Sequence, residues 1–100
     1  MNNPEDFKYA LETAVSDYKN DICQTALNAL SDKDIEFLRA MAADEGESRI
    51  SDIAGRLGVS GDYAQMYKRR LLDGGIIEQQ GRGRVKFAVP YLREHLRGRE

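Results

Sequence analysis

The sequence of 100 residues contains one cysteine, one histidine and two prolines. A single cysteine excludes an internal disulfide, and one cysteine with one histidine excludes the usual zinc sites. No apolar run approaches the roughly 20 residues that a membrane-spanning helix needs. The N-terminal residues are polar and acidic, unlike a signal peptide. We therefore expect a cytoplasmic protein with no metal site and no membrane contact.

Motifs for catalysis are also missing. No glycine-rich loop is followed by Lys and Ser or Thr, so the chain is not expected to be a P-loop nucleotidase itself. Gly81-Arg82-Gly83 is a lone G-x-G in a turn pattern and carries no value as a nucleotide motif. Acidic pairs such as Asp32 and Asp34 lie in polar turns without a partner nucleophile, which favours helix caps over a catalytic dyad. We predict no enzyme activity and no cofactor for this chain.

The distribution of charge is uneven along the chain. Residues 1–50 contain 5 basic and 11 acidic side chains, whereas residues 51–100 contain 10 basic and 6 acidic ones. A positive second half is what a phosphate-facing surface needs. Two halves that pair with each other, or with another domain, would show the same distribution. The overall composition, 41% apolar and 32% charged, is typical of one globular domain.

A long helix is predicted at the N-terminus. Asn3 is a suitable capping residue, and Pro4 suits the first helical position. Apolar residues then recur at steps of three and four along one face, at Phe7, Leu11, Ala14, Val15, Tyr18, Ile22, Ala26 and Leu30. We expect the first half of this helix to pack against something outside the chain or against a second copy. The alternative is an ordinary bundle helix that kinks and covers its own core.

A second helix is predicted to begin after Ser31, which can form a capping box with Asp34, and to end at the acidic turn 44–47. The periodicity places its buried face on Ile35, Leu38, Met41 and Ala42, with Phe37 off this face and packed under the first helix.

The next segment predicts a helix-turn-helix. Residues 48–50 form a short β-like run, and Ser51 is expected to cap a third helix. Gly58 suits a left-handed helix end, and Ser60 is expected to cap a fourth helix over residues 61–73. Ala64, Tyr67 and Leu71 form the apolar stripe of that fourth helix and are expected in the core.

Two short strands with a basic turn follow. The glycine pair Gly74-Gly75 ends the fourth helix, residues 76–79 form one strand, and residues 84–89 form the other. Glycines in the turn between them, 80–83, allow positive φ angles. Tyr91, Leu92 and Leu96 are expected to dock a last short helix. The fold class expected is mainly α with a small β-hairpin wing.

The domain organisation that we predict is a winged helix-turn-helix over residues 31–97. The N-terminal helix, 1–30, precedes it, and a frayed tail, 98–100, follows it.

Candidate DNA-binding residues lie on the outer face of the fourth helix and on the wing, at Gln65, Lys68, Arg69, Arg70, Arg82, Arg84 and Lys86. Gln65 could read an adenine edge, and the cations could contact phosphates. A solvated helix face is the competing interpretation, because Asp62 brings negative charge to the end of the helix that usually contacts bases. One wing cation could also pair with Glu78 across the strands.

Several segments together resemble the C-terminal winged-helix region of bacterial AAA-type ATPases, relatives of archaeal-type and replication-initiator-like ATPases. These segments are residues 30–42, 52–60, 63–71 and 81–92. The resemblance implies that the N-terminal helix is the end of an ATPase lid or its linker, that Met1 is the start of an excised fragment, and that ATP and Mg²⁺ belong to the parent protein.

Two functions remain open at this point. The first is a module that binds duplex DNA, weakly and with strong salt dependence. The second is a protein-interaction or regulatory module that docks on its own ATPase domain or on a neighbouring subunit, with homo-oligomerisation through the N-terminal helix.

Overall fold

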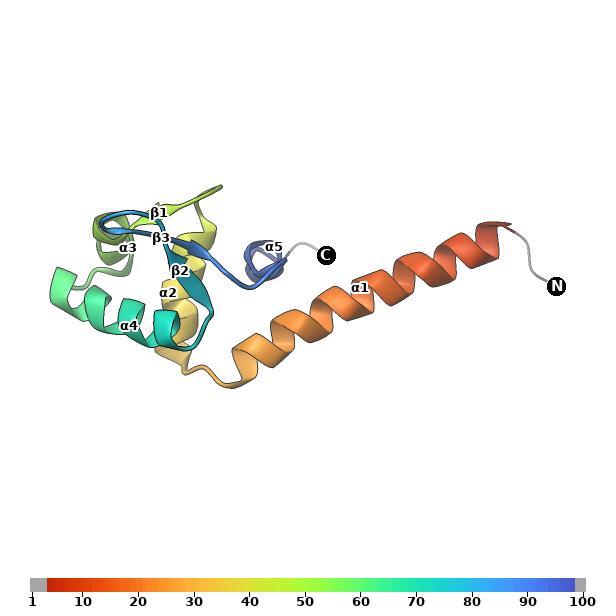
Figure 1. Ribbon diagram of the computed structural model, residues 1–100, viewed down its shortest axis with the longest axis horizontal. Helices are drawn as coiled ribbons and strands as arrows, with labels where there is room; N and C mark the ends of the chain where they lie inside the picture. The colour runs from red at the N-terminus through yellow and green to blue at the C-terminus, as the bar shows by residue number, and fades with distance from the viewer. Residues whose placement is uncertain (1–3, 99–100) are drawn as a thin grey trace.

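A long helix runs from the N-terminus into a cluster of four shorter helices and a small sheet (Figure 1). The computed structural model describes residues 4–98, with side chains from residue 7 onward. The elements in chain order are α1 (Pro4–Asn28), α2 (Asp32–Ala42), β1 (Ser48–Arg49), α3 (Ile50–Leu57), α4 (Gly61–Asp73), β2 (Ile77–Gln79), β3 (Arg84–Phe87) and α5 (Leu92–Leu96). This arrangement confirms a mainly helical fold with a small antiparallel sheet.

Helix α1 touches the rest of the molecule only near its C-terminal end. Every side chain from Phe7 to Asp21 is exposed, whereas Cys23 is buried and Ala26 and Leu27 pack against the core. Of the predicted apolar face, Ala26 and Leu30 do pack against the core, whereas Cys23 and Leu27 were not predicted to contact it. The predicted cap, Asn3, lies outside the described residues.

Helix α2 begins with the predicted capping box. Ser31 Oγ accepts a hydrogen bond from Asp34 N at 3.2 Å, and Asp34 Oδ2 accepts one from Ser31 N at 3.1 Å. Its most buried side chains are Phe37, Leu38 and Met41. Ile35 was predicted on the buried face of the helix but is only half-buried. Phe37, predicted off this face, is buried in the main core.

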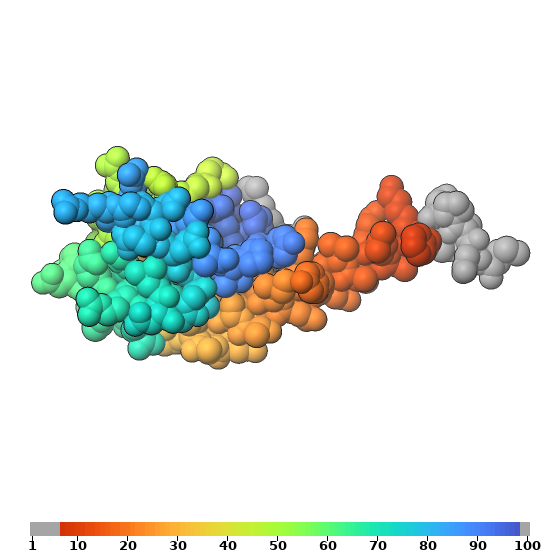
Figure 2. Space-filling view, viewed as in Figure 1, coloured from red at the N-terminus to blue at the C-terminus, as the bar shows by residue number. Residues whose placement is uncertain are grey.

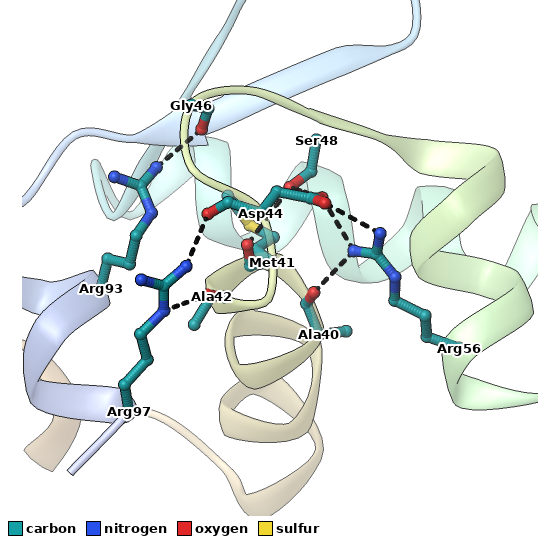
Figure 3. Close-up of polar contacts among 9 residues, drawn as sticks. All are labelled: Ala40, Met41, Ala42, Asp44, Gly46, Ser48, Arg56, Arg93 and Arg97. Atoms are coloured by element: carbon teal, nitrogen blue, oxygen red, sulfur yellow. Dashed lines mark hydrogen bonds and ion pairs between the residues drawn. The ribbon is translucent and has the colours of Figure 1, made fainter.

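Three arginines surround the C-terminal end of α2 (Figure 3). Arg56 donates to the carbonyl oxygen of Ala40 at 2.9 Å. From the C-terminal segment, Arg97 donates to the carbonyl of Ala42 at 2.6 Å, and Arg93 donates to that of Gly46 at 2.7 Å. Cations suit the negative end of a helix, where carbonyl groups lack intrahelical partners. These bonds fasten α5 to α2 and hold the segment that leads into β1.

The turn between α3 and α4 has the expected geometry. Gly58 adopts the left-handed conformation, with φ 69°, and its N–H closes α3. Ser60 then caps α4, with its Oγ accepting from Tyr63 N at 3.2 Å. The cap predicted at Ser51 was wrong, because α3 already begins at Ile50 after the extended Arg49.

The sheet has the strand order β1-β3-β2 and is antiparallel throughout. Ser48 pairs with Val85 and Arg49 with Arg84, while Ile77 pairs with Phe87. Val85, Ile77 and Ser48 face the core, so alternate residues point outward. Gly81 and Gly83, with φ of 74° and 70°, form the hairpin tip as predicted.

Helix α5 closes the domain on the side of α1 and α2. Leu92 is fully buried and Leu96 is half-buried. Tyr91 is 41% exposed and so is not buried in the core, but its ring lies beside α1, with Lys19 Nζ 5.0 Å from the ring centre. Of the predicted tail, residues 99 and 100 lie outside the described part of the chain. None of the described helices is both long and apolar enough to cross a membrane.

Candidate nucleic-acid interface

Helix α4 buries one face and presents the other to solvent. Ala64 and Leu71 are buried and Tyr67 is half-buried, as the apolar stripe predicted. Gln65 and Arg69, four residues apart, are exposed on the outer face. Met66 is exposed beside them, and Lys68 lies half-buried at the margin of this face.

The hairpin tip faces the N-terminal half of α4. A hollow of about 590 Å³ separates them, and its charged or amide side chains are Arg49, Gln65, Arg82 and Arg84. We call this hollow the arginine cleft. Its lining also includes Ser51 and Gly61, from the first turns of α3 and α4.

The tip of the hairpin is fixed in place by the backbone. Ile50 N donates to Gly83 O at 2.9 Å, and Gln80 N donates to Arg84 O at 2.8 Å. The first bond also satisfies the leading N–H group of α3, which has no partner within the helix. Backbone hydrogen bonds therefore fix the hairpin tip relative to the start of α3, and both segments line the arginine cleft.

Arg49 was not among the predicted site residues. It reaches the cleft because β1 pairs with β3 and sets Arg49 directly opposite Arg84. The short β-like run at residues 48–50 could have indicated this position. Side chains alternate between the two faces of a strand, so Arg49 lies on the face opposite the buried Ser48. The partner strand could not be assigned without the tertiary fold.

Two wing cations have acidic partners in their own chain. Arg84 NH1 lies 2.8 Å from Glu47 Oε1, and both side chains are 40% exposed or more. Lys86 Nζ lies 3.2 Å from Glu78 Oε1, directly across the strands. The second pair confirms the cross-strand pair considered from the sequence. Exposed pairs of this kind are weak, typically about 0–1 kcal/mol, and a phosphate can compete for them.

Arg70 is held away from the arginine cleft. Its Nε and NH2 donate to the two carboxylate oxygens of Asp34 at 3.2 and 2.9 Å. Asp34 is buried, and the hydrogen bonds from Arg70 and Ser31 lower its pKa below the ordinary value despite its burial. The same hydrogen bonds raise the pKa of Arg70. This pair ties α2 to α4 and gives Arg70 a structural role.

The structure thus brings together only part of the predicted site. Arg82, Arg84 and Gln65 border the arginine cleft, and Lys68 and Arg69 share the outer face of α4 with Gln65. Arg70 lines the same hollow on α4 as Lys68 and Arg69 but is bound to Asp34, whereas Lys86 borders a separate hollow beside Glu47 and Phe87. A role for either residue in DNA binding stays a prediction. Among the described residues, Arg49, Lys68, Arg69 and Arg82 form no ion pair.

A protein-family model, described as a domain of unknown function (DUF8462), matches residues 20–96, and the chain belongs to this family. The match begins on α1 one turn before the buried Cys23 and ends at α5. A search of curated proteins gave no match. Within residues 7–98, no group of three or more His, Cys, Asp or Glu side chains is arranged to hold a metal ion.

Proposed function

We propose that this chain is a winged helix-turn-helix module that binds duplex DNA, chiefly through phosphates. The order α2-β1-α3-α4-β2-β3 supports the winged assignment, with α3 and α4 as the helix-turn-helix and β2–β3 as the wing. The resemblance to the C-terminal winged-helix region of AAA-type ATPases supports it too. In such a protein, ATP and Mg²⁺ would be bound elsewhere in the polypeptide.

The observation that carries the proposal is the arginine cleft. Arg49, Arg82 and Arg84 come from two strands and a hairpin tip, yet they border one hollow at the start of α4. Guanidinium groups suit phosphate oxygens in charge and geometry. Gln65 lies on the same cleft and on the outer face of α4, so it joins the two basic areas.

The charges of α4 favour binding with little sequence preference. Asp62 is exposed in the first turn, where a recognition helix usually approaches base edges, and the cations Lys68 and Arg69 come later. Phosphate contacts position a protein without reading sequence. Affinity should therefore depend strongly on salt and weakly on base composition.

Fluorescence anisotropy with labelled duplexes of different sequence tests the proposal. Replacing Arg49, Arg82 or Arg84 by Ala should weaken binding to all duplexes alike and reduce the salt slope by about one per residue. Lys8→Ala is the matched control, because it removes one exposed cation on the outer half of α1, remote from the wing (Figure 1). Equal affinities and salt slopes for all four variants would exclude this function.

A protein-interaction module is the second candidate, and the exposed apolar side chains of α1 favour it. Docking on an ATPase domain or a neighbouring subunit would use this helix instead of the arginine cleft. Variants of the cleft would then leave complex formation unchanged, whereas a charge placed on the apolar face of α1 would abolish it.

A further inference from the structure

A hollow of about 380 Å³ lies between α1 and α5, near the docked end of α1. We call it the α1–α5 hollow. In Figure 2 the C-terminal segment, in blue, lies beside this end of α1, in orange. The volume is within the range of small-molecule sites, roughly 300–1,000 Å³. The lining of the hollow includes Lys19, Asn20 and Cys23 from one face of α1, and Tyr91, Glu94 and His95 from α5 and the residue before it.

The inner end of the hollow is apolar. Cys23 is 1% exposed, and its thiol donates a weak hydrogen bond to the carbonyl oxygen of Pro90, with Sγ and O 3.9 Å apart. Burial, together with the negative charge of Glu94, raises the pKa of this thiol, so the thiol stays neutral at pH 7. The Tyr91 ring borders the hollow from the side of α5. A neutral thiol and an aromatic ring together suit an apolar group of a ligand.

Tyr91 also has an unusual backbone conformation. Among the described residues it is the only non-glycine residue with a positive φ angle, 69°. A bulky residue in the left-handed region is strained, and strain of this kind is concentrated at ligand-binding sites and switch regions. The strained residue therefore coincides with a wall of the hollow.

Lys19 and Glu94 are opposite in charge and line the hollow from two different helices. Within the described part of the chain, neither of them forms an ion pair. Lys19 Nζ lies instead 5.0 Å from the centre of the Tyr91 ring. Cys23, Glu94 and His95 do not form a metal-binding group there either. An organic ligand with one charge of each sign can therefore meet both side chains in this hollow.

We propose that the α1–α5 hollow binds a free α-amino acid with an apolar side chain. The carboxylate of the ligand would accept hydrogen bonds from the Lys19 ammonium, and the ammonium of the ligand would donate to the Glu94 carboxylate. The side chain of the ligand would lie against Cys23 and Tyr91. A simple anion would be repelled by Glu94 and a simple cation by Lys19, so this pair of side chains selects a zwitterion.

A ligand in this position would contact both α1 and α5. Lys19 and Glu94 are exposed, so the hollow is open to water at its charged end, and a small ligand should bind with a Kd of roughly 1 mM. The attachment of α1 to the domain otherwise includes Cys23, Ala26 and Leu27. By adding contacts between the two helices, the bound amino acid would hold α1 more firmly against the domain.

NMR titration of the full chain with L-phenylalanine tests the binding. The resonances of Asn20, Tyr91 and His95 should shift in a saturable way. Two related probes each lack one charge: 3-phenylpropionate has no ammonium group, and phenethylamine has no carboxylate. Both should bind at least about five-fold more weakly than L-phenylalanine. The absence of saturable shifts, or equal affinities for the three probes, overturns the proposal.

Substitution of each charged side chain tests its role. In Lys19→Gln, L-phenylalanine should lose its advantage over phenethylamine, and in Glu94→Gln it should lose its advantage over 3-phenylpropionate. Lys8→Gln and Glu36→Gln are the matched controls, because they remove the same charges at exposed positions outside the hollow. Circular dichroism establishes that all four variants fold. If the preferences of the hollow variants equal those of the controls, Lys19 and Glu94 do not recognise the ligand and the proposal is refuted.

Discussion

Arg49 and Arg84 are directly opposed residues of β1 and β3, with both side chains on the outward face of the sheet. Like charges in this position destabilise a strand pair. Glu47 neutralises Arg84, but Arg49 has no ion pair among the described residues. An anion between the two guanidinium groups would relieve their repulsion. This relationship is the physical reason to expect a phosphate at the arginine cleft.

Removing the carboxylate that holds Arg84 should strengthen DNA binding. In Glu47→Gln, Arg84 loses its partner at 2.8 Å and no longer has to break an ion pair to reach a phosphate. We expect an increase in duplex affinity of about two- to five-fold at low salt, since exposed pairs contribute about 0–1 kcal/mol. Fluorescence anisotropy measures the effect.

Glu45→Gln is the matched control for this prediction. Glu45 belongs to the same acidic turn but pairs with Arg97, not with the wing. The same charge change there should alter affinity much less. If the two variants bind duplex equally, Glu47 has no specific influence on the arginine cleft.

Replacing the buried carboxylate of Asp34 should destabilise the fold. Asp34→Asn keeps the size of the side chain but removes the charge that accepts two hydrogen bonds from Arg70. We expect a loss of about 1–3 kcal/mol in the free energy of unfolding, measured by urea denaturation. Asp32→Asn, in the same first turn but exposed, is the control and should change stability by less.

The stability of the fold should fall in acid. Hydrogen bonds from Arg70 lower the pKa of Asp34, and those from Arg56 lower the pKa of Asp44. Carboxylates with lowered folded-state pKa values stabilise the fold above the unfolded value, near 3.9, and lose this contribution as the pH falls through the folded-state value. Thermal melts from pH 6 downward should show the decline mostly below about pH 4. A profile for Asp34→Asn as steep as that of the unsubstituted chain would contradict this assignment.

Gly55, within α3, and Gly58, directly after it, should respond to alanine in opposite directions. Gly58 has φ 69° with open space around its Cβ position, so Gly58→Ala should cost about 1–2 kcal/mol through backbone strain alone. Gly55 lies inside the helix, also with open space, and Gly55→Ala should stabilise by up to about 1 kcal/mol. Urea denaturation of both variants measures this difference, and equal changes in stability would show that the φ angle of Gly58 does not decide the outcome.

The features predicted correctly from the sequence are local ones. The Ser31–Asp34 capping box, the Gly58 turn and the Ser60 cap each depend on residues within a few positions of one another. The cap expected at Ser51 failed because a distant group, the Gly83 carbonyl, already satisfies the N–H of Ile50.

The candidate site was less predictable because its geometry depends on long-range pairs. Arg70 contacts an acid 36 positions away, and Arg84 contacts one 37 positions away. Composition indicated where basic residues accumulate, but only the tertiary fold determines which of them have acidic neighbours. The opposition of Arg49 and Arg84 depends on strand pairing in the same way.

Helix α1 runs without a break over 25 residues and joins an exposed N-terminal half to the end that carries the buried Cys23. At 1.5 Å per residue, this is an arm about 37 Å long. Because a continuous helix resists bending, whatever grips its outer end also controls the tilt of the domain at the other end. A small change in the direction of the helix at Phe7 would therefore move the wing, at the far end of the molecule, over a larger distance.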